Sequence, residues 1–456
     1  EQPATPSRAM GTQTIEEDPN VNTHRSFRRA PIPAALPAAL LAVFAGAQTA
    51  QASGFAVPEI STAGLGTANA MVANPDERGA FAYNPAAMAF HEQSSLPLGG
   101  LLIGPSFNVR KDSGRHDSEG ADWLIAPMVQ AAIRINEQWW AGLGVTAPFG
   151  LETRWPLGTF PKLTGVAPPP NPPVPLSPQP TQSKLEILNF TPTASYRVNE
   201  NLALSAGADF YWAKSAQLNS SITQLEGDGS GWGFNLSALY VKDALSLGIN
   251  FQSAASVELD GTYTAMVPLL VAAGQLSPSQ TGELDVNLPW RLQLGARYEI
   301  NPKLAVEVDW PRTGWSEFDE IKVTGGLNGS TLIQDQNQWG DANAYRFGAT
   351  YQLLDQTQLR LGYSYDETGQ GDDYFSARIP DNDRHLFSVG VSHALSDGWQ
   401  VEAGYMYVMF TDRDVSGVRP YAGSGGEING TDAVAGEYDA HAHLIGLEVS
   451  KTFDAF

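Results

Sequence analysis

From residue 94 onwards, apolar and polar residues alternate with a period of two, in segments separated by clusters of Gly, Asp, Asn and Pro. This alternation is typical of β-strands joined by turns. The pattern predicts fourteen strands, at residues 94–110, 123–135, 139–146, 184–198, 202–218, 232–241, 245–263, 284–299, 304–310, 344–353, 359–365, 385–394, 400–410 and 443–453.

The two faces of these strands differ consistently. In the predicted strand 284–299, Leu294 and Tyr298 share one face, and Arg297 lies on the other. Three later strands likewise place apolar residues and tyrosine opposite charged residues and glycine. A soluble barrel would bury those charges at a high cost. A barrel in lipid requires apolar residues outside, aromatic residues at the interfaces and polar residues in the lumen.

No apolar run reaches the roughly 20 residues that a membrane-spanning helix needs. The predicted fold is therefore an all-β membrane protein, a fourteen-stranded antiparallel transmembrane β-barrel. A soluble secreted β-protein is the alternative. Short predicted turns at 198–201, 299–303 and 395–399 alternate with long connections at 150–183, 264–282, 311–343, 366–384 and 411–442. In outer-membrane barrels, the long connections face the outside of the cell.

The N-terminal region has the features of a secretion signal. A basic stretch, RSFRR, precedes an apolar stretch at 34–47, and the small residues of AQA follow at 50–52. This order predicts a signal peptide that is cleaved before Ser53, with a polar leader ahead of it. The predicted domains are therefore residues 1–52, removed on secretion, a segment at 53–93, and the barrel at 94–456.

The segment 53–93 does not alternate. It contains the small, helix-tolerant stretch STAGLGTANAMVA and then AFAYNPAAMAF, in which Asn84-Pro85 interrupts an apolar run. Proline lacks a backbone N–H and pushes the preceding residue out of the helical region. About 40 residues rarely fold alone. We therefore expect a short helical plug that lies in the barrel lumen, although Asn84-Pro85 is also compatible with a simple helix-ending turn.

Composition narrows the chemistry. The net charge of -22 argues against nucleic-acid binding. The chain has no cysteine and no Gly-x-Ser-x-Gly motif, so we predict no enzyme, no cofactor and no metal site. Two alternatives stay open: His441 and His443 share one face of a strand and could form a metal pair, and the acidic stretch at 366–373 could bind calcium.

Several stretches resemble the long-chain fatty acid transporter family of outer-membrane proteins (FadL type), which includes aromatic-hydrocarbon uptake channels. In chain order these stretches are SGFAVPEISTAGLGTANA, AFAYNPAAM, WAGLGVTAPFGLETRW, LPWRLQLGARYEI, VEVDWPRTGWSEFDEI, RIPDNDRHLFSVGVSHAL and AHLIGLEVSKTF. The resemblance covers essentially the whole chain after the predicted signal peptide.

This resemblance implies a fourteen-stranded barrel plugged by an N-terminal hatch, in the outer membrane of a Gram-negative bacterium. It also implies passive uptake of hydrophobic compounds, through a groove among the outer loops, a pocket at the hatch, and lateral release into the bilayer. The implied ligand-binding residues are Phe149, Leu151, Trp155, Phe160, Leu163, Ser53, Gly54 and Phe55. The implied gating residues are Asn84, Pro85 and Ala86, and Pro148 would bend a strand at the lateral gap.

A carboxylate ligand would need a cation, and four lumen-facing arginines are available: Arg291, Arg297, Arg346 and Arg360. They could equally pair with acids of the lumen. The implied partners are a fatty acid, alkane or aromatic ligand, outer-membrane lipid and lipopolysaccharide, and the barrel-assembly machinery, with the channel a monomer. A general diffusion porin is the alternative function, and an outer-membrane enzyme is less favoured.

Overall fold

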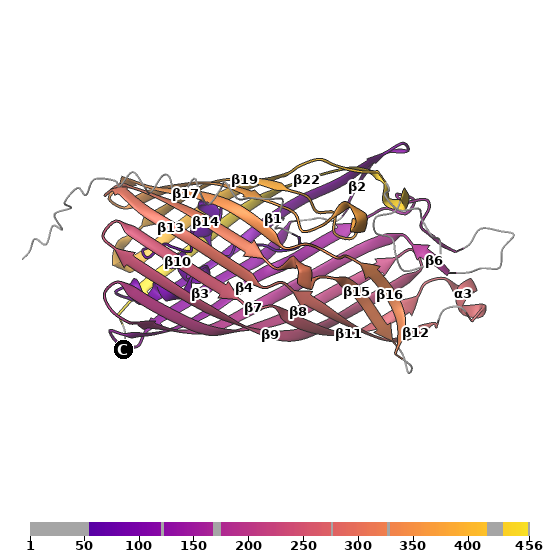
Figure 1. The fold of residues 1–456 in the computed structure, drawn as a ribbon, viewed down its shortest axis with the longest axis horizontal. Helices are drawn as coiled ribbons and strands as arrows, with labels where there is room; N and C mark the ends of the chain where they lie inside the picture. The colour runs from indigo at the N-terminus through magenta and orange to yellow at the C-terminus, as the bar shows by residue number, and fades with distance from the viewer. Residues whose placement is uncertain are drawn as a thin grey trace, which may run out of the picture. The chain divides into compact units, whose positions relative to one another are not determined.

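The computed structural model describes residues 54–119, 123–166, 175–274, 277–325, 329–416 and 432–454, which form a closed antiparallel barrel (Figure 1). The first six barrel strands are β1 (Ser94–Lys111), β3 (Leu124–Arg134), β4 (Trp139–Arg154), β7 (Pro180–Arg197), β8 (Leu202–Ser220) and β9 (Thr223–Lys242). Four further barrel positions each combine two strands: β10 (Leu245–Gln252) with β11 (Ala255–Ala265), β12 (Ser279–Leu288) with β13 (Arg291–Asn301), β14 (Leu304–Thr313) with β15 (Glu320–Gly325), and β16 (Ser330–Gln336) with β17 (Ala342–Leu354).

The last four barrel strands are β18 (Thr357–Asp366), β19 (Arg384–Ala394), β20 (Trp399–Phe410) and β22 (Gly436–Phe453). β22 pairs with β1 and closes the barrel, which confirms the predicted fourteen-stranded fold. Smaller elements extend the connections: β2 (Gly114–Asp117), β5 (Thr164–Val166), β6 (Pro175–Pro178), α3 (Pro268–Ala272) and β21 (Arg413–Val415). Among the described residues, no helix is long and apolar enough to cross a membrane.

Two predicted strands are broken in the structure, and one predicted loop contains strands. The strand predicted at 245–263 is interrupted between β10 and β11. Ile249 faces outward and Val257 faces inward, although their positions in the sequence differ by an even number of residues. A period-2 strand cannot change faces without a break. A second break falls at Pro289, which has no N–H for the ladder. The predicted connection 311–343 contains β15 and β16, which extend the barrel wall.

Strand β9 shows where the wall leaves the lipid. Its outward residues are polar or acidic as far as Ser230 and then become Trp232, Phe234 and Leu236. Neighbouring strands repeat this pattern, so that six carboxylates are exposed on one outer surface: Glu226, Asp228, Glu258, Asp260, Glu283 and Asp285. The inner face of the same region is apolar and includes Leu225, Leu259 and Leu284. The barrel therefore extends beyond the apolar belt, and its polarity is inverted in that extension. Figure 1 shows α3, β6 and β12 at this end and the C-terminus at the other.

Residues 54–93 lie within the barrel. They form α2 (Thr62–Gly66) and the 3-10 helices η1 (Arg78–Ala82) and η2 (Pro85–Phe90). The Ser61 hydroxyl accepts the N–H of Gly64 and caps α2, which glycines keep short. α2 packs against β18, β19 and β20, whereas η2 packs against β7, β8 and β9, so the segment touches distant parts of the wall. These contacts are consistent with the predicted plug at 53–93.

Glycines on the inner wall let the backbone of the N-terminal segment approach closely. A Cβ added to Gly248 would lie 2.0 Å from the carbonyl oxygen of Val72, and one added to Gly362 would lie 2.2 Å from the carbonyl carbon of Thr67. Side chains cannot occupy such positions unless the segment moves. Gly248 and Gly362 therefore define where the segment docks.

Buried charges also hold the segment to the wall. Arg360 is 1% exposed and lies 2.7 Å from Glu77 of the segment and 2.8 Å from Glu402 of β20. Two wall carboxylates accept three consecutive N–H groups of the segment. Asp309 accepts those of Met71 and Val72 at 2.9 and 3.1 Å, and Glu307 accepts that of Ala73 at 2.7 Å. The lumen charges that would be costly in an apolar core are thus satisfied by the segment.

We expect the substitution Gly248→Val to force Val72 away from the wall and to lower the free energy of unfolding by about 1–3 kcal/mol, the usual cost of overpacking. Denaturant unfolding of the detergent-solubilised protein measures this. The control is Gly100→Val, because a Cβ at Gly100 meets its nearest atom at 3.8 Å. Equal unfolding midpoints for the two variants would contradict the close docking of Val72.

We expect Arg360→Leu to leave Glu77 and Glu402 buried without their cation and to lower the free energy of unfolding by about 3–5 kcal/mol. The same unfolding measurement applies. The control is Arg110→Leu, which breaks the exposed 2.8 Å pair with Glu437 and should cost at most about 1 kcal/mol. Similar losses in both variants would mean that the buried pair has no special role.

Candidate functional site

The N-terminal segment begins inside a cluster of aromatic side chains. The ring of Phe55 lies 4.8 Å from Trp315, 5.1 Å from Phe318 and 5.8 Å from Phe149, measured between ring centroids, and Trp339 completes the group. We call these five residues the aromatic cluster. Each ring is buried, and edge-to-face pairs stabilise such a group beyond the area it buries. The cluster therefore fixes the start of the segment.

A buried carboxylate holds the residue before Phe55. The N–H of Gly54 donates to Asp381 Oδ2 at 2.9 Å, and the hydroxyl of Thr368 donates to the same oxygen at 2.5 Å. Arg384 and these hydrogen bonds favour the charged form of Asp381, but burial has the larger effect and raises the pKa of Asp381 above its ordinary value. Ser53, the predicted first residue after cleavage, lies outside the described residues.

The next residues of the segment act as an additional strand beside β4. Ala56 bridges Phe149 in an antiparallel sense. Val57 donates its N–H to the carbonyl of Pro148 at 2.8 Å, and Gly150 donates its N–H to the carbonyl of Phe55 at 3.0 Å. The predicted strand kink at Pro148 therefore lies where the segment meets the wall.

The ladder between β3 and β4 is interrupted at the same place. Among the described residues, it ends at the pair Met128–Thr146, while β3 continues to residue 124 in contact with β1 alone. Across the other edge of β4, two residues, Ala147 and Pro148, oppose one residue of β7, which is the geometry of a β-bulge. Pro148 has no N–H to offer to either neighbour.

An apolar cavity adjoins the aromatic cluster. It is lined by Phe55, Phe318, Leu151, Leu185, Leu218 and Leu259, and it encloses about 480 Å³ when its open mouth is included. Lys184 and Arg378 are the cations of its lining, and Arg378 pairs with Asp335 at 3.1 Å with both side chains buried. Of the predicted ligand-binding residues, Phe55 and Leu151 line this cavity directly, and Phe149 packs in the same cluster.

Three other predicted ligand-binding residues lie elsewhere. Trp155, Phe160 and Leu163 are buried among outer-loop residues that include Phe375 and Val434. The indole N–H of Trp155 donates to the carbonyl of Ala377 at 2.7 Å. These side chains lie outside the lining of the apolar cavity, and packing within the loops accounts for their burial.

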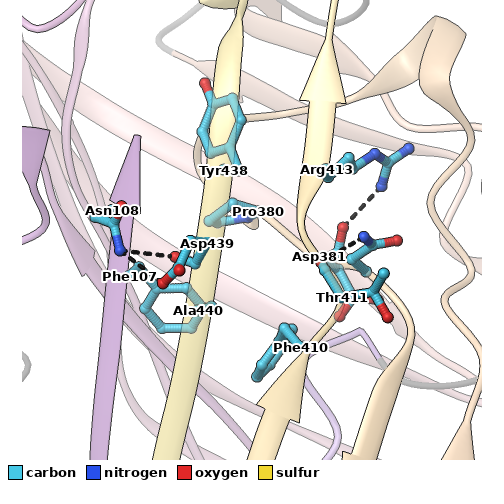
Figure 2. A pocket seen from close by; sticks show the side chains of 11 residues that line it. Phe107, Asn108, Pro380, Asp381, Phe410, Thr411, Arg413, Tyr438, Asp439 and Ala440 are labelled. Atoms are coloured by element: carbon cyan, nitrogen blue, oxygen red, sulfur yellow. Dashed lines mark hydrogen bonds between the residues drawn. The ribbon is translucent and has the colours of Figure 1, made fainter. Parts of the chain in front are cut away.

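Asp381 also forms part of the lining of a cleft, which is shown in Figure 2. Phe107 of β1, Phe410 of β20 and Ala440 of β22 line it from the wall, and Pro380 and Asp381 line it from the loop before β19. Arg413 donates to the carbonyl of Asp381 at 2.7 Å and, at the same distance, to the carboxylate of Asp372. These two contacts of Arg413 hold the loop that carries Asp381.

The four predicted head-group arginines fall into two pairs. Arg360 and Arg297 bind acids of the segment, Arg360 through Glu77 and Arg297 through Asp76 at 3.6 Å. Arg291 and Arg346 instead line a second cavity. The sequence could not separate the pairs, because all four lie on the same inward face.

This second cavity, the arginine chamber, is lined by Arg291, Arg346 and Arg384, with Asp366 on the wall beside them. In the part of the chain that the structure describes, none of the three arginines forms an ion pair with a carboxylate. Arg291 stacks on Phe149 at 5.3 Å from the ring centroid. The chamber therefore offers hydrogen-bond donors and positive charge to whatever enters it.

The predicted gating residues hold the end of the segment. Asn84 caps η2 through its side-chain oxygen, and its amide donates to the carbonyl of Val72 at 2.7 Å and to that of Ala238 in β9 at 3.1 Å. The hydroxyl of Ser195 in β7 donates to the carbonyl of Pro85 at 2.8 Å. Ala86 donates its N–H to the Ser237 hydroxyl at 3.2 Å. All three residues therefore anchor the segment to the wall.

His441 and His443 lie on the outer face of β22, with ring centroids 5.7 Å apart. The Nδ1 of His443 is 2.8 Å from the Tyr405 hydroxyl. Within the described ranges, no group of three or more His, Cys, Asp or Glu residues is placed to hold a metal ion.

Sequence reasoning missed four residues of this site: Trp315, Phe318, Trp339 and Asp381. Three of them lie in stretches that carried the family resemblance, since VEVDWPRTGWSEFDEI contains Trp315 and Phe318, and RIPDNDR contains Asp381. Nothing in the local sequence distinguishes Trp339. Only contact with Phe55 across the lumen reveals its place.

Comparisons with known proteins show the family and the fold of the chain. Residues 43–453 match the family model described as outer membrane protein transport protein (OMPP1/FadL/TodX). A long-chain fatty acid transport protein of Escherichia coli O6:H1 is 25% identical, over 79% of this chain and 87% of its own length.

Two solved structures share the fold. A Pseudomonas aeruginosa FadL homologue superposes with a TM-score of 0.72 at 19% identity, covering 88% of this chain and 100% of its own. The Ralstonia pickettii toluene transporter TbuX superposes with a TM-score of 0.61 at 16% sequence identity. The match covers 85% of this chain and 97% of the TbuX chain. The protein is thus located in the outer membrane of a Gram-negative bacterium. The chain belongs to the outer membrane protein transport protein family (OMPP1/FadL/TodX).

Proposed function

We propose that the chain is a channel for the passive uptake of hydrophobic compounds, long-chain fatty acids or hydrocarbons, across the outer membrane. The interruption between β3 and β4 at Pro148, covered from the lumen by residues 55–57, is the observation that carries this proposal. The names of the relatives, one a fatty acid transporter and one a toluene transporter, support the same class of substrate.

The path starts in the apolar cavity at the outer end of the barrel. An apolar solute gains roughly 25 cal/mol for each Å² of surface that it buries, so Leu151, Leu185 and Leu218 compete well with water for it. Phe55 borders this cavity, and it moves with the first residues of the segment. Displacement of Phe55 connects the cavity to the interruption in the wall.

The solute then leaves sideways into the bilayer. At the interruption, β4 is held on its β3 side by Phe55 and Val57 rather than by β3, so withdrawal of the segment opens the wall without breaking a strand pair. Residues 53–93 act as the hatch, and Asn84, Pro85 and Ala86 keep its far end in place while its start moves. The solute bypasses the polar lumen, and the process needs no cofactor.

Arg291 and Arg346 hold the head group of a carboxylate ligand, since both face the arginine chamber below Phe55. A general diffusion porin is the second candidate function. It would need an open aqueous lumen, but the N-terminal segment packs against opposite parts of the wall here. A low steady conductance in a planar bilayer distinguishes the plugged channel from a porin.

We expect deletion of Ala147 to remove the extra residue of the bulge, to close β4 onto its neighbours and to abolish uptake. The measurement is the uptake of labelled oleate and of labelled toluene by a Gram-negative host that lacks its own transporter. The native protein should admit one or both compounds, which also identifies the substrate.

The matched control is deletion of Leu353. This residue is the extra one in the irregular pairing of β17 with β18, on the side of the barrel opposite to β4 in the strand order. Its deletion should leave uptake intact. Equal uptake by the native and Ala147-deleted proteins, both folded, would refute lateral release. Uptake of small sugars in place of oleate and toluene would favour the porin.

A further inference from the structure

Amide side chains gather on the inner wall directly behind the interruption at Pro148. Gln130 of β3, Asn189 of β7, Asn235 of β9 and Asn250 of β10 line one cavity with Pro148. Ile60 and Phe81 of the N-terminal segment cover it from the lumen. We call this cavity the amide chamber. Its position makes it the last space in the lumen before the bilayer along the proposed path.

A buried carboxylate sets the orientation of two of these amides. Asp209 accepts the Nδ2 of Asn189 at 2.9 Å and the Nδ2 of Asn235 at 3.2 Å. Since the nitrogen of each amide is bound to Asp209, its carbonyl oxygen must point elsewhere. The Nε2 of Gln130 is likewise bound, at 2.9 Å from the carbonyl of Ile60.

The four carbonyl oxygens have no hydrogen-bond partner within the described part of the chain: those of Gln130, Asn189, Asn235 and Asn250. Each of these side chains is at most 9% exposed. Buried acceptors are normally paired, because an unpaired one carries its desolvation cost without a return. Four such oxygens around one cavity indicate that something with hydrogen-bond donors belongs there.

The chemistry of this chamber is opposite to that of its neighbour. The amide and arginine chambers share Ile60, Ala82, Asn250, Gln252 and Arg291 and are therefore contiguous. The arginine chamber presents donors and suits a carboxylate, which only accepts hydrogen bonds. The amide chamber shares Arg291 but adds four unpaired acceptors, and an ionised carboxylate has no proton to give them.

We infer that the amide chamber is a subsite for an uncharged, hydrogen-bond-donating head group, such as the hydroxyl of an alcohol or phenol or a protonated carboxyl. The inference rests on the proposed function and adds to its substrates amphiphiles that reach the wall opening with a donor intact. The carbonyls of Asn189, Asn235 and Asn250 hold that donor while the apolar tail enters the bilayer past Pro148. An alkane or an ionised acid gains nothing from these contacts.

Asn250 is the residue on which to test this. It forms no side-chain hydrogen bond among the described residues, so its replacement leaves no protein group newly unpaired. The variant Asn250→Leu keeps the number and branching of the side-chain heavy atoms but removes the acceptor, and Asn250→Thr restores an acceptor oxygen. The control Ser246→Val places an apolar side chain on the same inner face of β10.

The assay measures uptake of labelled dodecan-1-ol and labelled dodecane by transporter-deficient cells that carry each variant. Loss of one hydrogen bond should lower uptake of dodecan-1-ol by Asn250→Leu about fivefold, with dodecane unchanged. Asn250→Thr and Ser246→Val should transport both probes as the native protein does. Heat-modifiable migration of each variant in gels confirms that its barrel is folded.

Three outcomes would overturn the inference: an equal fall of both probes in Asn250→Leu, no fall of either, or no rescue by Asn250→Thr. The first would make Asn250 a packing residue, and the second would make the chamber a space for water only. Failure of the native protein to admit either probe, oleate or toluene refutes the proposed function itself and is thereby distinguished from failure of the subsite.

Discussion

The structure depends on one constraint: backbone N–H and C=O groups within the hydrocarbon layer must find partners inside the protein. A closed barrel meets it by pairing each strand with its neighbours, but among the described residues the ladder between β3 and β4 stops at Met128–Thr146. There the carbonyl of Pro148 and the N–H of Gly150 are bonded by Val57 and Phe55 of the N-terminal segment. The segment thus substitutes for the missing length of strand, which couples its position to the integrity of the wall.

The lumen is polar for a related reason. The N-terminal segment is short and rich in glycine and alanine, so it cannot be held by a large apolar core. Wall carboxylates instead accept its N–H groups, as Asp309 and Glu307 do, and Arg360 bridges Glu77 to Glu402. Directional contacts of this kind position a segment accurately without making its surface apolar. The contacts close to Gly54 and Phe55 are separate from the contacts close to Asn84.

Inversion of polarity along the strands separates the tasks of the two ends. In the lipid-facing part of β9, Trp232, Phe234 and Leu236 face outward, and small or polar residues face the lumen. Beyond Ser230 the outer surface is acidic, and the inner surface supplies Leu225, Leu259 and Leu284. The apolar cavity therefore adjoins the extension, where it is lined by Leu259 and Leu284, and the amide and arginine chambers are lined by polar side chains of the lumen. The change from an apolar lining in the apolar cavity to polar linings in the two chambers follows from this inversion of the strands.

The strand number and the transmembrane character could be predicted from the sequence alone, because a local period of two needs no knowledge of distant contacts. The composition of 53–93 indicated only that this stretch does not belong to the strands of the wall. The sequence did not reveal that Arg291 and Arg346 face a cavity while Arg297 and Arg360 pair with acids of the segment. Nor did it reveal that Trp155 and Phe160 are buried in loops while Phe149 meets Phe55. Local alternation places a residue on a face of the wall. Only closure of the barrel, with its register and breaks, decides which residues from opposite walls meet across the lumen.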